Sequence, residues 1–172
     1  ELTLNDYKRI IDELYSLGLY RVCLTGGDPF SKPEVWEILD YLYNKNIVFD
    51  IYTNGLSITH SVDRLRSLYP RLVGISIYSA DEMVHDKITR VNGSLKRTLQ
   101  TVKDIGRYGI PMAFKCVIFK TNVKSYQTVE SLAKEHGAVL QYEVNLSNGV
   151  DGDTSVVNNL RLPPEVLEIV LL

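Results

Sequence analysis

The sequence is poor in the residues that most metal and redox sites use. Among its 172 residues there are two cysteines, three histidines and one tryptophan. Cys23 and Cys116 each stand inside an apolar run and do not form a C-x-x-C pair, so the sequence predicts two buried thiols and no zinc or redox motif. The absence of a disulfide framework favours a reducing, cytoplasmic location.

Long apolar runs and a strong net charge are also missing. No run approaches the ~18 apolar residues of a membrane-spanning helix, and no signal peptide is evident, so we expect no contact with a membrane. The net charge is −2 and the basic residues are scattered along the chain, which excludes the basic surface of a nucleic-acid-binding protein. With 45% hydrophobic and 23% charged residues, the composition is typical of one globular domain.

What the sequence does contain is a regular alternation of apolar patterns. Apolar residues spaced three and four apart predict helices, and short continuous apolar runs predict strands. The predicted helices lie at 4–17, 35–43, 62–69, 95–105 and 129–133, and the predicted strands lie at 20–25, 47–52, 72–78, 110–119 and 138–144. Such apolar strands are typical of a parallel sheet covered by helices, so the fold class is α/β, a barrel or an open sheet.

Further patterns indicate the start of one helix and the division of the chain into domains. Ser31 and Glu34 have the spacing of a capping box and predict the start of the second helix. Residues 145–159 are rich in Asn, Gly, Asp and Ser and predict a long loop, after which Pro163-Pro164 restarts a helix. We therefore predict a core domain over 1–146 and a C-terminal segment over 147–172. Because the chain starts without Met and stops while still apolar, we expect it to be cut from a longer protein.

Polar residues gather where the predicted strands end. Gly26-Gly27-Asp28 follows the first strand, Thr53-Asn54-Gly55 follows the second, and Ser76 lies in the third. Ligands of parallel α/β proteins bind at the carboxyl ends of the strands, and paired glycines let a backbone approach a ligand closely. This set suits a polar ligand with an amine, a carboxylate and a ribose. A plain strand-to-helix turn is the alternative for the glycine pair.

The remaining ionisable residues do not form a catalytic pair. We expect His60, His85 and His136 at the surface, and we expect Lys115, inside the fourth predicted strand, to point to the mouth of a barrel. Asp151-Gly152-Asp153 resembles part of a calcium loop but lacks the remaining ligands, so a solvated turn is predicted. No catalytic and no metal-ligating residue is predicted.

The order of these motifs resembles the radical SAM superfamily, in the group that includes molybdenum-cofactor, pyrroloquinoline-quinone and peptide-maturation enzymes. Asp28 stands where the family more often has Glu. The matching segments, in chain order, are Leu2-Thr3-Leu4-Asn5-Asp6, Thr25-Gly26-Gly27-Asp28-Pro29, Thr53-Asn54-Gly55, His85-Asp86-Lys87-Ile88-Thr89-Arg90, Gly93-Ser94-Leu95 and Asn122. Each piece alone is a weak signal, and the ordered set is specific.

The resemblance implies a fold and a first group of ligand contacts. The family fold is a partial TIM-like barrel of six βα units with parallel strands, and five strands fit here if the first is missing. By position, Gly26, Gly27 and Asp28 would bind the amino group of S-adenosylmethionine.

Four further residues take their expected roles from the same resemblance. Ser76 would contact the ribose or the carboxylate of S-adenosylmethionine, and Arg90 would hold the carboxylate. Thr53 and Asn54 would shape the cofactor pocket.

The resemblance also implies an activity, from which this chain departs in one respect. The family is identified with iron–sulfur oxidoreductases that cleave S-adenosylmethionine to a 5′-deoxyadenosyl radical for hydrogen abstraction. Their 4Fe–4S cluster is held by a C-x-x-x-C-x-x-C loop, which this chain lacks. We expect that loop upstream of Glu1, so this fragment by itself would be inactive. The expected partners are a peptide or small-molecule substrate and an electron donor, with no nucleic acid.

Two alternatives remain open from the residues. One is a cluster-free homologue that acts as a binding or scaffold protein. The other is an unrelated TIM-barrel enzyme with a phosphate or carboxylate substrate, for which Gly149 and Gly152 are a faint indication.

Overall fold

The structure is a computed structural model that describes residues 2–146 and 154–171. All five predicted strands are confirmed: four of them are shorter than predicted, and the second is shifted by one residue along the chain. The helices are α1 (Leu4–Ser16), α2 (Val35–Asn44), α3 (Val62–Ser67), α4 (Glu82–Thr89), α5 (Ser94–Arg107), α6 (Thr128–Glu135), α7 (Ser155–Leu160) and α8 (Pro164–Leu171), with the 3-10 helix η1 (Pro29–Ser31). The strands are β1 (Arg21–Leu24), β2 (Val48–Thr53), β3 (Leu72–Ser76), β4 (Met112–Val117) and β5 (Val139–Glu143).

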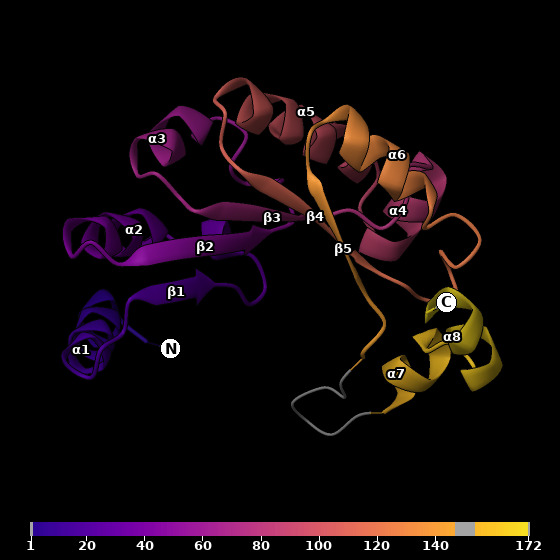
Figure 1. Cartoon of the computed structure of the whole chain (residues 1–172), viewed down its shortest axis with the longest axis horizontal. Coiled ribbons are helices and arrows are strands. Elements are labelled where there is room, and N and C mark those ends of the chain that lie inside the picture. Colours follow the sequence, from indigo (N-terminus) through magenta and orange to yellow (C-terminus); the bar gives the residue numbers. More distant parts are fainter. Residues whose placement is uncertain (1, 147–153, 172) are drawn as a thin grey trace. The chain divides into compact units, whose positions relative to one another are not determined.

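The strands form one sheet in the order β1-β2-β3-β4-β5 (Figure 1). The pairs β1–β2 and β2–β3 are parallel, and the predicted α/β class with five parallel strands is confirmed. The order follows the sequence without a reversal. A doubly wound open sheet reverses its strand order, whereas a βα barrel does not, so the topology is of the barrel type.

The contacts divide the chain into two compact units, which are described separately. Unit 1 comprises Glu1–Ser76 and Arg97–Ala113, and unit 2 comprises Ile77–Lys96 and Phe114–Leu172. The predicted domain boundary between residues 146 and 147 is a different division, and it stays a prediction.

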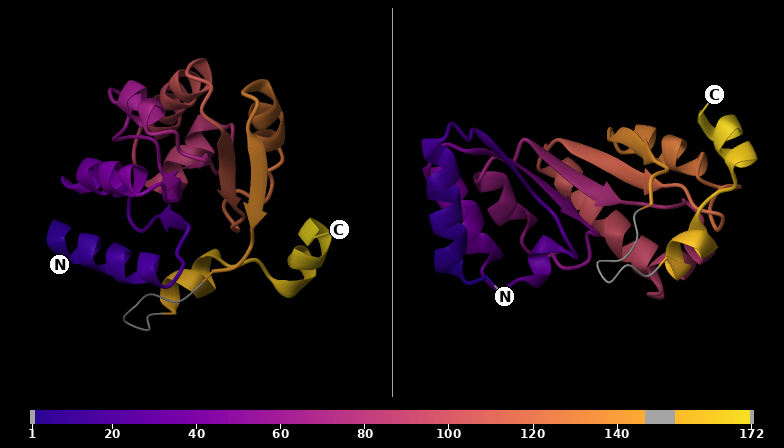
Figure 2. Two further views of the ribbon diagram at one scale, coloured as in Figure 1. Left: turned by 60° about the vertical axis from the view of Figure 1, so that its left-hand side comes forward. Right: turned by 90° about the horizontal axis from the view of Figure 1, so that it is seen from below.

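In unit 1, α1 lies alongside α2, and α2 packs on β2 (Figure 2). One face of β2 and β3 is buried, as shown by Ile51, Val73 and Ile75, all of which are 0% exposed. Because side chains alternate along a strand, the opposite face carries Arg21 and Asp50. We call this second side of β1–β3 the Asp50 face.

In unit 2, α6 packs on β5 (Figure 2). The buried side chains include Phe114 and Cys116 of β4 and Val129 of α6. The backbone N–H of Lys120 donates to the carbonyl of Leu160 at 2.9 Å, which ties the end of α7 to the segment after β4.

A capping box forms at the start of α1 and does not form at the start of α2, where one was predicted. At α1, the backbone N–H of Thr3 donates to the Asp6 carboxylate at 2.9 Å, and the backbone N–H of Asp6 donates to the Thr3 hydroxyl at 3.3 Å. At α2 the prediction is wrong, because the Ser31 hydroxyl donates to the carbonyl of Asp28 at 2.6 Å and the Glu34 side chain caps nothing. Asp28 organises the preceding segment instead, as the N-cap of η1.

The C-terminal prediction is also partly wrong. Residues 155–160 form α7 and are not part of a loop, and α8 begins at Pro164 as expected. The rest of that predicted loop, including Gly149 and Asp151-Gly152-Asp153, lies outside the described residues. Within the ranges that are described, no helix combines the length and apolar character needed to cross a membrane. The predicted cytoplasmic location stays a prediction.

Candidate functional site

The turn that leaves β1 is built around its glycine pair. Gly26 has a φ of 98°, in the region that favours glycine, so the residue type is required by the backbone. Gly27 has no such constraint, and a Cβ added there would meet no atom within 4 Å. Both glycines are exposed. The turn therefore presents open backbone at the carboxyl end of an edge strand.

Asp28 joins this turn to the one that follows β2. One carboxylate oxygen accepts the backbone N–H of Phe30 at 3.0 Å. The other accepts the hydroxyl of Thr53 at 2.7 Å and the backbone N–H of Asn54 at 2.8 Å. Three of the residues singled out in the sequence, Asp28, Thr53 and Asn54, are thereby brought together within unit 1.

Two threonines of α5, which were not among the predicted site residues, support the second turn. Thr98 donates its hydroxyl to the carbonyl of Asn54 at 2.9 Å, and Thr101 donates to the carbonyl of Gly55 at 2.7 Å. Gly55 has a φ of 79°, and a Cβ there would lie 3.3 Å from the Thr98 methyl. The signal that could have found them is two threonines three residues apart on a mainly apolar helix face.

Ser76 and Arg90 are placed in different units. Ser76 is the half-buried last residue of β3 in unit 1, next to the fully buried Ile75. Arg90, in unit 2, is the exposed C-cap of α4 with a φ of 59°. The roles that the resemblance gives them stay predictions.

The segment around Arg90 forms a closed loop held by Asp86. The Asp86 carboxylate accepts the Ser94 hydroxyl at 2.7 Å and the backbone N–H groups of Leu95, at 3.1 Å, and Gly93. Burial raises the pKa of Asp86, but the hydrogen bonds from Ser94, Leu95 and Gly93 outweigh it, so its pKa lies below the ordinary value. The ionised carboxylate thus caps the start of α5 from within α4.

His85 is buried, and the prediction of a surface position is wrong. Its side chain is 1% exposed, and its Nδ1 accepts the backbone N–H of Tyr78 at 3.3 Å. The residue lies on α4, which begins after the N-cap Asp81, whose side chain accepts the N–H groups of Met83 and Val84. His60 is exposed, as predicted.

The burial of His85 predicts a pH-dependent stability. Burial lowers the pKa of His85, and the nearby charge of Asp86 opposes this only in part. The unfolded chain therefore takes up a proton first, near the ordinary histidine pKa of about 6.5. We expect the free energy of unfolding to be fully retained above that pH and to fall below it, by at most about 1.4 kcal/mol per pH unit.

Urea unfolding followed by circular dichroism between neutral and mildly acidic pH measures this effect. His85→Phe should reduce the slope, because it removes the titrating group. His60→Gln, at an exposed position, is the matched control and should leave the slope unchanged. An unaltered slope in His85→Phe would assign the pH dependence to other groups.

The two cysteines differ in their surroundings. Cys116 is fully buried as predicted, and burial raises the pKa of its thiol to about 12. Cys23 is exposed, so the prediction of a buried thiol is wrong there, because β1 is the edge strand of the sheet. Across the described residues, no three His, Cys, Asp or Glu side chains gather in a way that could hold a metal ion.

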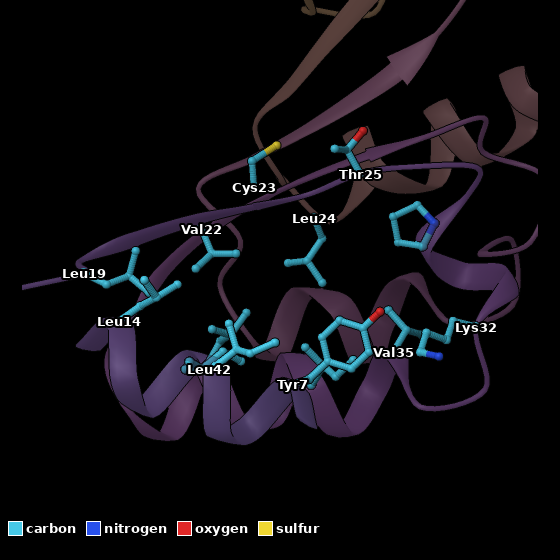
Figure 3. A pocket seen from close by; sticks show the side chains of 14 residues that line it. Tyr7, Leu14, Leu19, Val22, Cys23, Leu24, Thr25, Lys32, Val35 and Leu42 are labelled. Atoms are coloured by element: carbon cyan, nitrogen blue, oxygen red, sulfur yellow. The ribbon is translucent and has the colours of Figure 1, made fainter. Parts of the chain in front are cut away.

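An apolar pocket lies beside edge strand β1 in unit 1 (Figure 3). Its volume is about 300 Å³. Tyr7 and Leu14 of α1, Val22 and Leu24 of β1, and Leu42 of α2 are among its lining residues. The pocket thus lies along the side of β1 that faces away from β2.

Comparison with known proteins gives a family match. A family model described as "Radical SAM superfamily" matches residues 1–134. The AdoMet-dependent heme synthase of Methanosarcina barkeri is 31% identical over 156 residues, which cover 90% of this chain and 45% of that protein. The mycofactocin maturase MftC of Mycobacterium tuberculosis is 32% identical over 143 residues, which cover 82% of this chain and 36% of that protein. The chain spans less than half the length of these curated relatives.

Solved structures show the same fold. Streptococcus suis SuiB bound to S-adenosylmethionine matches with a TM-score of 0.78 at 17% identity, over 97% of this chain and 39% of that one. SuiB bound to the precursor peptide SuiA matches with a TM-score of 0.75 at 15% identity, over 97% of this chain and 38% of that one.

Proposed function

Because this chain belongs to the radical SAM superfamily, we propose that unit 1 binds S-adenosylmethionine at the turns that follow β1 and β2. The observation that carries the proposal is the open backbone at Gly27, where an added Cβ would meet nothing within 4 Å. An edge-strand turn with this much space suits the close approach of a ligand. The family assignment rules out the alternative of an unrelated TIM-barrel enzyme.

In this proposal, the residues of the two turns have different roles. Gly26, Gly27 and Asp28 receive the amino group, with the negative charge of Asp28 close to it. Thr53 and Asn54 shape the pocket, since they hold the Asp28 carboxylate in place at 2.7 and 2.8 Å. Asp28 is therefore both a source of charge and a positioning residue.

Two further contacts are proposed from the resemblance alone. Ser76 of unit 1 would contact the ribose or the carboxylate. Arg90 of unit 2 would contact the carboxylate, and its exposed guanidinium supports that role.

The chemistry proposed for the whole protein is reductive cleavage of S-adenosylmethionine by an oxidoreductase. A bound 4Fe–4S cluster would supply the electron, and an electron donor would reduce the cluster. The described residues do not fit such a cluster, because it needs several thiolates and only Cys23 and Cys116 are present. The cluster ligands are therefore proposed to lie upstream of Glu1.

The substrate class we propose is a peptide or a small molecule. The match to SuiB bound to a precursor peptide and the 32% identity to a mycofactocin maturase favour the peptide.

A further strand beside β1 is part of the same proposal. β1 is the edge strand of the sheet, and the apolar pocket next to it can receive apolar side chains. A sixth parallel strand at this edge would complete the six-unit barrel of the family.

Calorimetric titration of the chain with S-adenosylmethionine tests the cofactor proposal. We expect saturable binding by the wild-type chain and binding weakened at least about tenfold by Gly27→Ala, because the added methyl occupies the space that the ligand needs. The fold should tolerate this change, since the new Cβ has no neighbour within 4 Å.

Gly106→Ala is the matched control. Gly106 lies in α5, where a Cβ would make an ordinary contact with the Met112 methyl at 3.4 Å. This variant should bind S-adenosylmethionine like the wild type. No binding by the wild type, or equal binding by Gly27→Ala and Gly106→Ala, would contradict the assignment of the turn.

A further inference from the structure

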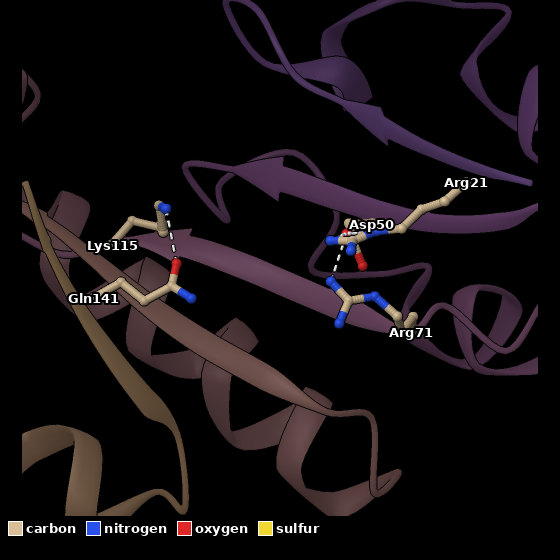
Figure 4. A network of polar contacts seen from close by, with 5 residues as sticks. All are labelled: Arg21, Asp50, Arg71, Lys115 and Gln141. Carbon is tan, nitrogen blue, oxygen red and sulfur yellow. Dashed lines mark hydrogen bonds and ion pairs between the residues drawn. The ribbon is translucent and has the colours of Figure 1, made fainter. Parts of the chain in front are cut away.

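A carboxylate lies buried in the middle of the sheet of unit 1. Asp50 of β2 is fully buried and lies between Cys23 of β1 and Leu72 of β3 in the strand register. Burying an ionised carboxylate is costly unless it is paired. Arg21, at the start of β1, and Arg71, just before β3, converge on it (Figure 4).

Both arginines bind the same oxygen of Asp50. The Arg21 Nε donates to Oδ2 at 2.9 Å, and the Arg21 Nη2 donates to the same atom. The Arg71 Nη2 donates to Oδ2 at 2.7 Å. The other oxygen, Oδ1, is buried and has no hydrogen-bond partner among the described residues. One buried acceptor atom is thus left for a donor that the described chain does not provide.

The cluster carries excess positive charge. Burial raises the pKa of Asp50, but hydrogen bonds from Arg71 and Arg21 outweigh it, so the pKa lies below its ordinary value and the carboxylate is ionised at neutral pH. Two guanidinium groups therefore face one negative charge. Their side chains are 43% and 44% exposed, and each guanidinium has five N–H donors, more than Asp50 uses.

We propose that Arg21 and Arg71, held by Asp50, form a binding site for an oxyanion group, a carboxylate or a phosphate, on the Asp50 face of unit 1. Exposed guanidinium N–H groups match the geometry of both anions. The site is independent of the turns proposed to bind S-adenosylmethionine.

Nuclear magnetic resonance of the arginine Nε–H groups tests the proposal directly. The whole chain is titrated with sodium phosphate, and separately with sodium acetate, at constant ionic strength and without S-adenosylmethionine. We expect the signals of Arg21 and Arg71 to shift and saturate, while the signal of Arg9, which is exposed and paired with Glu13, stays in place. The tighter of the two probes identifies the preferred anion.

Two variants distinguish anion binding at this site from a general effect of positive charge on the surface. Arg71→Gln should weaken the binding of the better probe at least about tenfold, since a charged donor is lost. Arg64→Gln is the matched control, because Arg64 is also paired with an aspartate, Asp40, at 3.0 Å. It should leave the affinity unchanged.

Either of two results would overturn the proposal. If neither Arg21 nor Arg71 responds to either probe, the cluster is structural only. If Arg71→Gln does not fold, Arg71→Lys keeps the charge and loses the planar fork, and wild-type affinity in that variant would also overturn the proposal. A negative result leaves the S-adenosylmethionine proposal untouched, because no S-adenosylmethionine is present in the assay.

Discussion

Replacing Asp28 by Ala should weaken the binding of S-adenosylmethionine at least about tenfold and lower the free energy of unfolding by about 2 kcal/mol. The variant removes the acceptor for Phe30, Thr53 and Asn54, so the turns after β1 and β2 are no longer joined. It also removes the negative charge proposed to attract the amino group. Calorimetric titration and urea unfolding measure the two effects.

A ligand without the amino acid portion separates the two roles of Asp28. Methylthioadenosine lacks both the amino group and the carboxylate of S-adenosylmethionine. If Asp28 acts on the amino group, Asp28→Asn should lose affinity for S-adenosylmethionine and keep its affinity for methylthioadenosine. Equal losses of affinity for both ligands would show that Asp28 acts only by positioning the two turns.

Asp40→Ala provides the stability control for this variant. Asp40 forms an ion pair with Arg64 in which both side chains are nearly half exposed. Exposed pairs of this kind contribute about 0 to 1 kcal/mol, so Asp40→Ala should change stability little and cofactor binding not at all.

Replacing Asn122 by Ala should destabilise unit 2 by about 3 kcal/mol. Asn122 is fully buried, and its Oδ1 accepts the backbone N–H of Phe119 at 2.7 Å. Its Nδ2 donates to the carbonyls of Tyr78 and Val117 at 2.8 and 2.9 Å. Alanine leaves these backbone groups without their partners inside the protein, and unfilled buried hydrogen bonds are costly.

Urea unfolding measures this loss, with Asn159→Ala as the matched control. Asn159 is an exposed residue of α7, where truncation should change stability by no more than about 0.5 kcal/mol. If Asn122→Ala and Asn159→Ala have equal stabilities, the three hydrogen bonds of Asn122 do not contribute as the geometry indicates.

The candidate site shows which of its residues local sequence patterns can predict and which they cannot. The glycine pair, the acidic residue after it and the Thr53-Asn54-Gly55 turn could be recognised because each is a short run of neighbouring residues at a strand end. The support from Thr98 and Thr101 could not, since α5 is more than 40 positions away from the turn it holds. A hydroxyl on a helix has the same local signature whether it faces solvent or a carbonyl.

His85 and Ser31 show the opposite error, a local pattern read too literally. A polar stretch around His85 indicated a surface loop, but α4 forms there and buries the ring against Tyr78. The Ser31 and Glu34 spacing fits a capping box, yet the Ser31 hydroxyl is used by the carbonyl of Asp28. Competing partners decide such cases, and the local pattern does not contain them.

The sequence by itself determined the α/β class, the five strands, the two turns and the family, because these depend on apolar periodicity and on short motifs in a set order. The tertiary structure alone decided which distant groups meet. Arg21 and Asp50 are 29 positions apart, and Asp28 and Thr53 are 25 apart. Their contacts depend on the register between parallel strands, and that register is set by packing over the whole sheet and not by any stretch of neighbouring residues.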